Sequence, residues 1–127
     1  MIKSSSIEYI KNFYTILFQL INFLIDKYPE DNKAKLYKRK VESARRINTR
    51  FVIAEFMKNM IIHETYIINR DHNYFINLNY NNNVDKENLQ EVFRLRKLWI
   101  DSNDEESKEF VFKCLQELLY YGHLLGY

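Results

Sequence analysis

Residues 7–28, with the sequence IEYIKNFYTILFQLINFLIDKY, decide the fold class of this chain. Their polar side chains recur at helical spacing and form one narrow stripe, whereas the other positions are apolar. A helix with so wide an apolar face must be enclosed by partner elements. Polar residues in every turn, and the lack of any run of 18 apolar residues in the chain, also argue against a membrane span. The stretch therefore predicts a helix mostly covered by other parts of the fold.

Capping and breaking residues predict where five helices begin and end. Ser5 and Glu8 form a capping box for the first helix, and Pro29 ends it. Later caps are expected at Asp31 or Asn32, at Thr49, at Asp85, and at Ser102 together with Glu105. The second helix covers the stretch 33–50, the third runs roughly over 50–69, the fourth over 85–100 and the fifth to about residue 125. No segment alternates as a strand would, so residues 1–127 are predicted to form a single domain, an all-α bundle of about five helices.

Helical periodicity also predicts which side chains are buried. The expected core face of the second helix comprises Ala34, Leu36, Tyr37, Val41, Ala44 and Ile47. That of the third helix comprises Ile53, Phe56, Met57, Met60, Ile61, Ile67 and Ile68. That of the fifth helix comprises Phe110, Val111, Cys114, Leu115, Leu118 and Tyr121. A segment between the third and fourth helices, at Asp71 and Asn73, suits a turn or a single helical turn that tucks Tyr74 against the core.

The charge of the chain is concentrated in residues 33–50, KAKLYKRKVESARRINTR, which hold eight of its nineteen basic side chains and a single acidic one, Glu42. The formal net charge of the whole chain is only +2, too small to imply a polyanionic partner for the molecule as a whole. On a helical wheel the cations lie opposite the apolar positions, so they form the outer face of a helix. The candidate binding residues on this face are Lys35, Lys38, Arg39, Arg45, Arg46 and Arg50. Such a face can meet nucleic-acid phosphates or an acidic protein surface, or simply be solvated.

Two charged residues interrupt apolar helix faces. Glu64 falls within the face of the third helix, and Arg96 falls within that of the fourth. Because an unpaired buried charge is costly, we expect Glu64 and Arg96 to form a structural ion pair between these helices. A catalytic carboxylate at position 64 is the alternative.

Other chemistry finds little support in the sequence. His63 and Glu64 resemble the start of an H-E-x-x-H zinc motif, but Ile67 stands where the second histidine belongs. The single cysteine, Cys114, lies on an apolar face and is expected to be a buried structural thiol. Phosphate-binding glycine motifs and nucleophile-elbow motifs are absent from the sequence. We therefore expect no enzyme activity, no cofactor and no metal. Tyr9, Tyr66, Leu98 and Tyr120 fall outside the predicted core faces and can form a surface for a partner or a second copy.

Two segments resemble a known group of proteins. Residues 23–76 combine an aliphatic helix, an aromatic-Pro-acidic-Asp turn (28–31, YPED), a basic helix and a second helix. Residues 95–122 begin with a Leu-x-x-Leu-Trp segment, followed by an acidic cap and a Leu-rich helix. Together they are similar to small uncharacterised helical proteins of nucleocytoplasmic large DNA viruses. The dominance of Asn, Ile, Lys, Tyr and Phe, which have AT-rich codons, agrees with this resemblance. It implies a viral origin and a place in the host cytoplasm or the virion, and it brings no functional residues.

The sequence therefore favours a non-enzymatic helical protein with an interaction or structural role, acting through contacts with a protein partner or in a homo-oligomer. The alternative is a nucleic-acid-binding protein that uses the basic helix.

Overall fold

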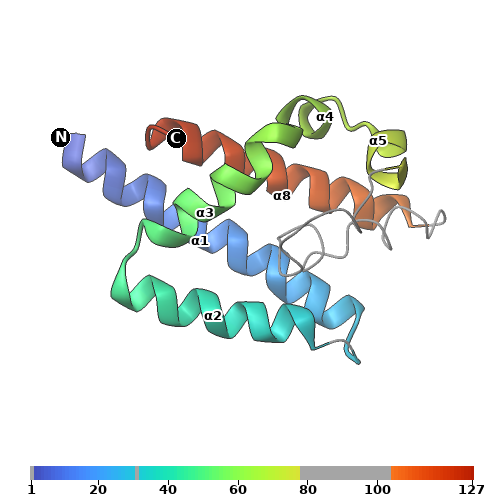
Figure 1. Ribbon diagram of the computed structural model, residues 1–127, viewed down its shortest axis with the longest axis horizontal. Coiled ribbons are helices and arrows are strands. Elements are labelled where there is room, and N and C mark those ends of the chain that lie inside the picture. The colour runs from blue at the N-terminus through green and yellow to red at the C-terminus, as the bar shows by residue number, and fades with distance from the viewer. Residues whose placement is uncertain (1, 31, 78–103) are drawn as a thin grey trace.

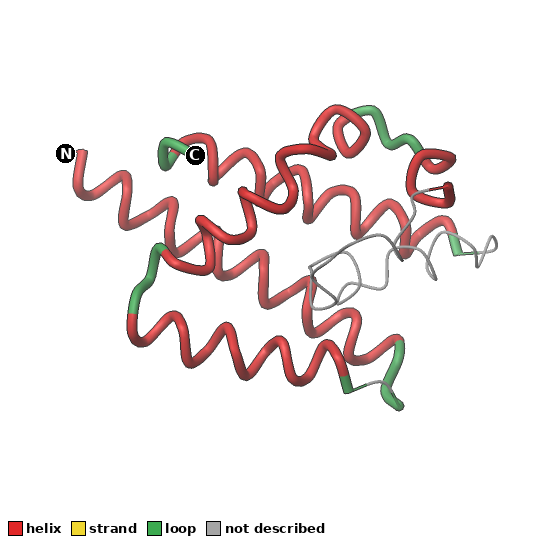
Figure 2. Tube along the Cα trace, viewed as in Figure 1, coloured by secondary structure: helices red, strands yellow, loops and turns green. Residues whose placement is uncertain are grey.

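The structure, a computed structural model, describes residues 2–30, 32–77 and 104–127. The helices in chain order are α1 (Ile2–Lys27), α2 (Lys33–Ile47), α3 (Phe51–Met60), the 3₁₀ turn η1 (Ile61–His63), α4 (Glu64–Ile68), α5 (His72–Asn77) and α8 (Glu105–Leu124). Within these ranges there is no strand, and the predicted all-α class is confirmed (Figure 1; Figure 2). The predicted fourth helix lies outside the described residues.

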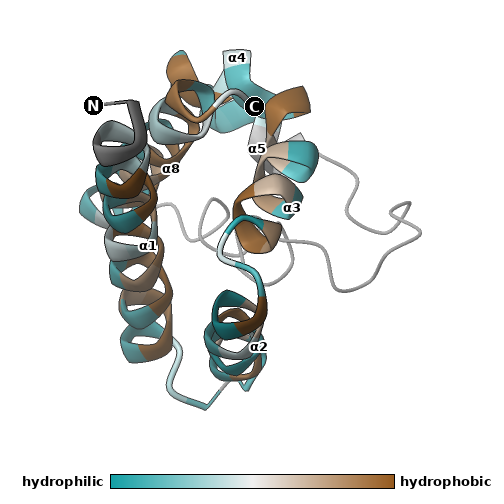
Figure 3. Ribbon diagram, turned by 90° about the vertical axis from the view of Figure 1, so that its left-hand side faces the viewer, coloured by the Kyte–Doolittle hydropathy of each residue, from teal (hydrophilic) through white to brown (hydrophobic). Residues whose placement is uncertain are grey.

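Helix α1 packs along both α8 and α2, and so it has neighbours on more than one side (Figure 1). Its buried side chains include Phe13, Leu17 and Leu20, all with no exposed surface. Phe13 makes an edge-to-face contact with Phe56 of α3, with ring centroids 5.5 Å apart. The apolar side of α1 faces α2 and α3, and the polar stripe faces outward (Figure 3). The wide apolar face read from residues 7–28 is therefore the centre of the core.

The ends of α1 agree only in part with the predicted signals. The helix stops at Lys27, two residues before Pro29, as the restriction on residues preceding proline requires. Its start at Ile2 is earlier than the predicted start at Ser5. No proline or glycine lies between these positions, so nothing in the local sequence stops the helix from extending toward the N-terminus.

The predicted third helix is broken into shorter pieces. Helix α3 ends at Met60, and the 3₁₀ turn η1 separates it from α4. Residues on either side of such a turn no longer share one face, because three residues per turn replace 3.6. Ile61 and Ile68, both predicted to be buried, are therefore 42% and 58% exposed. His63 takes up a buried position instead.

The caps also differ from the predicted ones. The side chain of Asn48, rather than Thr49, accepts a hydrogen bond at the α2–α3 corner, from the backbone N–H of Arg50 at 3.0 Å. The predicted turn at Asp71 is confirmed, because its Oδ1 accepts from the N–H of Tyr74 at the start of α5. Helix α8 is capped by Asp104, whose carboxylate accepts from the N–H of Ser107. The predicted cap at Ser102 lies outside the described residues.

Helix α8 crosses α3 closely at Gly122. A Cβ at this position would lie 2.2 Å from Sδ of Met57, far inside van der Waals contact. Gly122, near the C-terminal end of α8, is therefore buried at a helix–helix crossing. No helix among the described residues is long and apolar enough to cross a membrane.

Candidate functional site: the outer face of α2

The candidate binding residues lie on α2 and just beyond it. We use the name basic face of α2 for Lys35, Lys38, Arg39, Arg45, Arg46 and Arg50. All are exposed except Lys38, which is half-buried, and Arg50 stands just beyond the helix as the residue before α3. Ala34 and Val41 on the opposite side are buried in the core. The packing of one side of α2 thus holds the cations of the other side in a constant arrangement.

Three arginines of this face have no ionic partner within the described ranges. No carboxylate lies in an ion pair with Arg39, Arg46 or Arg50 there. Lys35 differs, because its Nζ donates to the backbone oxygen of Pro29 at 3.0 Å and so closes the α1–α2 turn. The unpaired guanidinium groups leave planar hydrogen-bond donors directed at solvent, which suits carboxylate or phosphate groups.

Arg45 has a structural role that the other arginines lack. Its guanidinium lies over the ring of Tyr14, 4.4 Å from the centroid, and 6.0 Å from the centroid of Phe18. Such stacking is the usual cation–π arrangement of arginine. Burial raises the pKa of the Tyr14 hydroxyl to about 12, while the nearby Arg45 charge acts in the opposite direction. Arg45 therefore joins α2 to α1, and its side chain is less available to a partner than Arg39 or Arg46.

Two apolar side chains lie among the cations, contrary to the sequence prediction. Leu36 and Ile47 were expected in the core, but they are 54% and 87% exposed. The buried arc of α2 is narrower than predicted, because its fully buried residues are only Ala34 and Val41. Leu36, Ser43 and Ile47 stand at spacings of seven and four residues and share one side of the helix, which we call the α2 stripe. Arg39 and Arg46 border one side of this stripe, three residues after Leu36 and Ser43.

Glu64 has a partner other than the predicted one. Its Oε2 lies 2.6 Å from Nε2 of His123 on α8. Nδ1 of His123 lies 2.7 Å from the main-chain oxygen of Tyr127. Since both ring nitrogens face oxygen acceptors, only the imidazolium form donates to both. The hydrogen bond with Glu64 and then that with Tyr127 raise the pKa of His123 above 6.5. The predicted contact with Arg96 lies outside the described residues.

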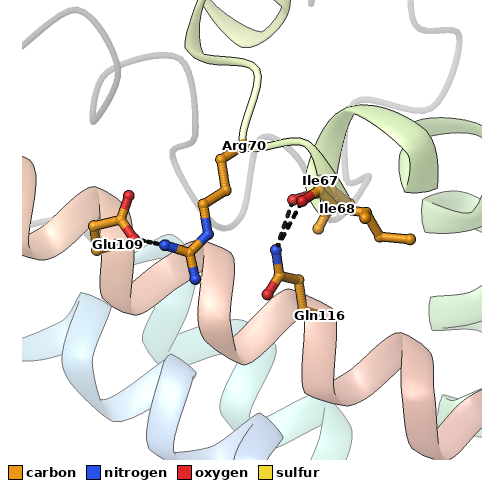
Figure 4. A network of polar contacts seen from close by, with 5 residues as sticks. All are labelled: Ile67, Ile68, Arg70, Glu109 and Gln116. Atoms are coloured by element: carbon orange, nitrogen blue, oxygen red, sulfur yellow. Dashed lines mark hydrogen bonds and ion pairs between the residues drawn. The ribbon is translucent and has the colours of Figure 1, made fainter.

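Two further contacts hold the segment that contains α4 against α8 (Figure 4). Nε2 of Gln116 donates to the backbone oxygens of Ile67 and Ile68, at 3.0 and 3.3 Å. Arg70, which has a positive φ of 53°, forms an ion pair with Glu109. The amide of Gln116 thus adds a donor to the carbonyl of Ile67, which also accepts from the N–H of Arg70, and supplies one to the carbonyl of Ile68 at the end of α4. These contacts give Glu109 and Gln116 of α8 a structural role.

The remaining reactive side chains are used in packing. His63 is buried, and its Nδ1 lies 2.6 Å from the hydroxyl of Tyr74. Burial lowers the pKa of His63. Cys114 is 4% exposed, and burial raises the pKa of its thiol to about 12, so the nucleophilic thiolate is scarce. Over the described ranges, no three His, Cys, Asp or Glu side chains are grouped so that they could hold a metal ion.

Comparison of the chain with protein-family models, with curated proteins and with solved structures gave no match. Function therefore has to be argued from the side chains themselves.

Two tertiary pairings were not predicted from the sequence. The Glu64–His123 and His63–Tyr74 contacts join residues 59 and 11 positions apart. A polar residue on an apolar face signals that some partner exists, as it did for Glu64. Which residue supplies the partner depends on how α4 lies along α8, and periodicity contains no such information.

Proposed function

We propose that this is a non-enzymatic helical interaction or structural protein that binds a protein partner through the outer face of α2. The observation that carries the proposal is the exposure of Leu36 and Ile47 beside arginines that have no ionic partner among the described residues. The partner surface would be acidic and partly apolar. The resemblance of residues 23–76 and 95–122 to proteins of large DNA viruses supports a viral origin, with action in the host cytoplasm or in the virion.

The apolar side chains favour a protein over a nucleic acid. Protein interfaces have an apolar centre surrounded by polar groups, and arginine is enriched in them. Affinity for a nucleic-acid backbone comes from neutralised phosphates, and Leu36 and Ile47 would add nothing to it. Ile47, at 87% exposure, has much apolar surface to lose on binding.

Site-directed photo-crosslinking tests the proposal directly. A benzophenone amino acid replaces Ser43, the exposed polar position of the α2 stripe, in cells that make the protein. The matched control carries it at Ile62, which is 69% exposed and lies on η1. We expect crosslinked products at position 43 that resist nuclease and are destroyed by protease, and that Arg39→Glu with Arg46→Glu removes. Products that nuclease destroys would overturn the proposal.

Nucleic acid is the second candidate, favoured by the three arginines that have no ionic partner in the part of the chain that the structure describes. Binding of labelled duplex DNA and single-stranded RNA at two salt concentrations tests it. If phosphates are the ligand, affinity falls steeply with salt, and the triple change of Arg39, Arg46 and Arg50 to Glu abolishes binding. The uncharged change Ile47→Ser leaves phosphate binding intact but weakens a protein contact. Arg45 is left unchanged because it packs on Tyr14.

A further inference from the structure

We propose that the acidic partner of α2 is the outer face of α8 on a second copy of this chain. The inference rests on the proposed function and names its partner. It begins with the exposed side of α8, whose residues follow one another at helical spacing. These residues, which we call the α8 ridge, are Glu106, Lys113, Glu117, Tyr120 and Leu124.

We use the name α2 face for the basic face of α2 together with the α2 stripe. The α8 ridge carries the acidic and apolar side chains that this face needs in a partner. Tyr120 and Leu124 are 59% and 42% exposed and stand one turn apart. Glu106 is exposed and Glu117 is half-buried, and neither is in an ion pair with another residue that the structure describes. Tyr120 also lies edge-on to Tyr121, whose ring borders α1, so the aromatic surface is held in place.

The two faces are complementary in sign and can lie alongside each other. The α2 stripe spans eleven residues, from Leu36 to Ile47, and the α8 ridge spans eighteen, from Glu106 to Leu124. At 1.5 Å per residue these spans are about 16 and 27 Å, so the α2 stripe can lie along the ridge over three turns. Each face also holds one charge of the opposite sign, Glu42 on α2 and Lys113 on α8. A contact between the two faces can therefore pair the arginines of α2 with the glutamates of α8. It can also pair Glu42 with Lys113.

Contacts between like faces are disfavoured. Two α2 faces would bring Arg39 and Arg46 against the same arginines, and two parallel α8 ridges would bring Glu106 and Glu117 against their own copies. Opposed like charges at an interface cost affinity. Within one chain, α2 and α8 lie on different sides of α1 (Figures 1 and 3). The α2 face of one copy therefore meets the α8 ridge of the next, and this head-to-tail contact leads to rings or open chains.

A mixing experiment tests this arrangement by sedimentation velocity. Ile47→Asp places a negative charge on the α2 face, and Tyr120→Lys places a positive charge on the α8 ridge. Each variant alone has one intact face and one blocked face, so it is expected to remain monomeric. An equimolar mixture has one intact pair of faces and should form a 1:1 dimer that grows no further. The wild type should form larger species as its concentration rises.

The control variant carries its new charge away from both faces. Ile62→Asp changes an exposed apolar residue on neither face and should assemble like the wild type. The inference is overturned if the wild type stays monomeric at all concentrations, or if the mixture is no more associated than its components. Dimers formed by either variant alone would also overturn it, since they indicate a symmetric contact.

The failure of this inference can be told apart from failure of the proposed function. If Ser43 crosslinks to a protein other than a second copy, the proposed function stands and the self-association is wrong. If Ser43 crosslinks to nucleic acid, the proposed function is wrong as well. A product of twice the chain mass at position 43 supports both, provided that Tyr120→Lys removes it.

Discussion

Arg45 and Arg46 are neighbours in the sequence, yet only one of them packs on the protein. The guanidinium of Arg45 lies over Tyr14, whereas Arg46 is exposed without an ionic partner among the described residues. A run of basic residues read as one binding face thus contains a residue that joins two helices. The distinction arises because Arg45 lies nearer the buried edge of α2, where α1 supplies an aromatic ring.

We predict that Arg45→Gln lowers the free energy of unfolding by about 0.5–1 kcal/mol, the usual size of a partly exposed cation–π contact. Arg46→Gln, its matched control, should leave stability unchanged. Urea unfolding followed by circular dichroism measures both variants. Equal effects of the two changes would show that the stacking on Tyr14 contributes nothing.

His123 is the residue whose protonation is tied most directly to tertiary structure. Its pKa is raised by Glu64 and by the Tyr127 oxygen, so its contribution to stability is fully present below the unfolded pKa of 6.5. That contribution is lost as the pH rises through the raised folded pKa. The His123 side chain is 39% exposed, so solvent screening limits the loss to about 0.2–1 kcal/mol.

We predict that Glu64→Gln returns the pKa of His123 toward 6.5 and reduces this loss of stability on the alkaline side, with the Tyr127 hydrogen bond still in place. Proton NMR titration of the histidine ring signals measures the pKa, and thermal unfolding at several pH values measures the loss. His63 is an internal reference, because burial lowers its pKa and it should titrate below 6.5 in both proteins. An unchanged His123 pKa in Glu64→Gln would contradict the contact.

At the scale of elements, the sequence predicts a helix well where the apolar residues keep one helical spacing. It fails where that spacing changes. The α1, α2 and α8 segments were predicted within a few residues, because each keeps one apolar face over several turns. The break at η1 was missed, because residues 61–63 (IIH) contain neither proline nor glycine. It arises from tertiary packing, in which α4 turns to place Ile67 in the core and its end against Gln116.

The candidate site shows the same division. Charged side chains every third or fourth residue need only a helix to share a side, but Arg45 packs on Tyr14 and Arg50 lies beyond the end of α2. The exposed Leu36 and Ile47 were predicted wrongly, because a helical wheel says which residues share a side but not how much of that side a neighbour covers. The partner of Glu64 required knowledge of how α4 lies along α8.

Gly122 gives a prediction for the crossing of α3 and α8. Gly122→Ala would add a Cβ 2.2 Å from Sδ of Met57, which is itself 2% exposed and has little room to move. Overpacking costs about 1–3 kcal/mol, against a gain in helix propensity of about 1 kcal/mol. We expect a net loss of up to about 2 kcal/mol in denaturant unfolding, from the difference of these two terms.

A double-mutant cycle separates crowding from other causes. Met57→Val shortens the side chain that the new Cβ meets, so it should cost less in the Gly122→Ala protein than in the wild type. Additive costs, or a gain in stability from Gly122→Ala alone, would mean that α3 and α8 do not approach as closely as described.

At the scale of the whole molecule, α1 determines whether the other helices stay in place. It packs against α2 and α8, and an ion pair of Lys27 with Asp104 joins its C-terminal end to the start of α8. The hydrogen bond from Lys27, followed by that from Ser107, lowers the pKa of Asp104 to about 2. The α2 face and the α8 ridge are thus both presented by elements that depend on the same central helix.

We predict that Phe13→Ala, which removes the contact with Phe56, destabilises α2 and α8 together, although Phe13 belongs to neither binding face. Truncating a fully buried phenylalanine costs about 3–5 kcal/mol, a large share of the roughly 5–15 kcal/mol that stabilises a typical domain. Hydrogen exchange should then show faster exchange throughout α2 and α8, since both lose the same support.

The control is Ile7→Ala, on the same helix but 66% exposed, which should leave exchange unchanged. Faster exchange in α8 with α2 unaffected would mean that α2 is held by contacts other than α1, such as those with α3. In that case the two faces would be independently stable, and a change on one would not disturb the other through the core.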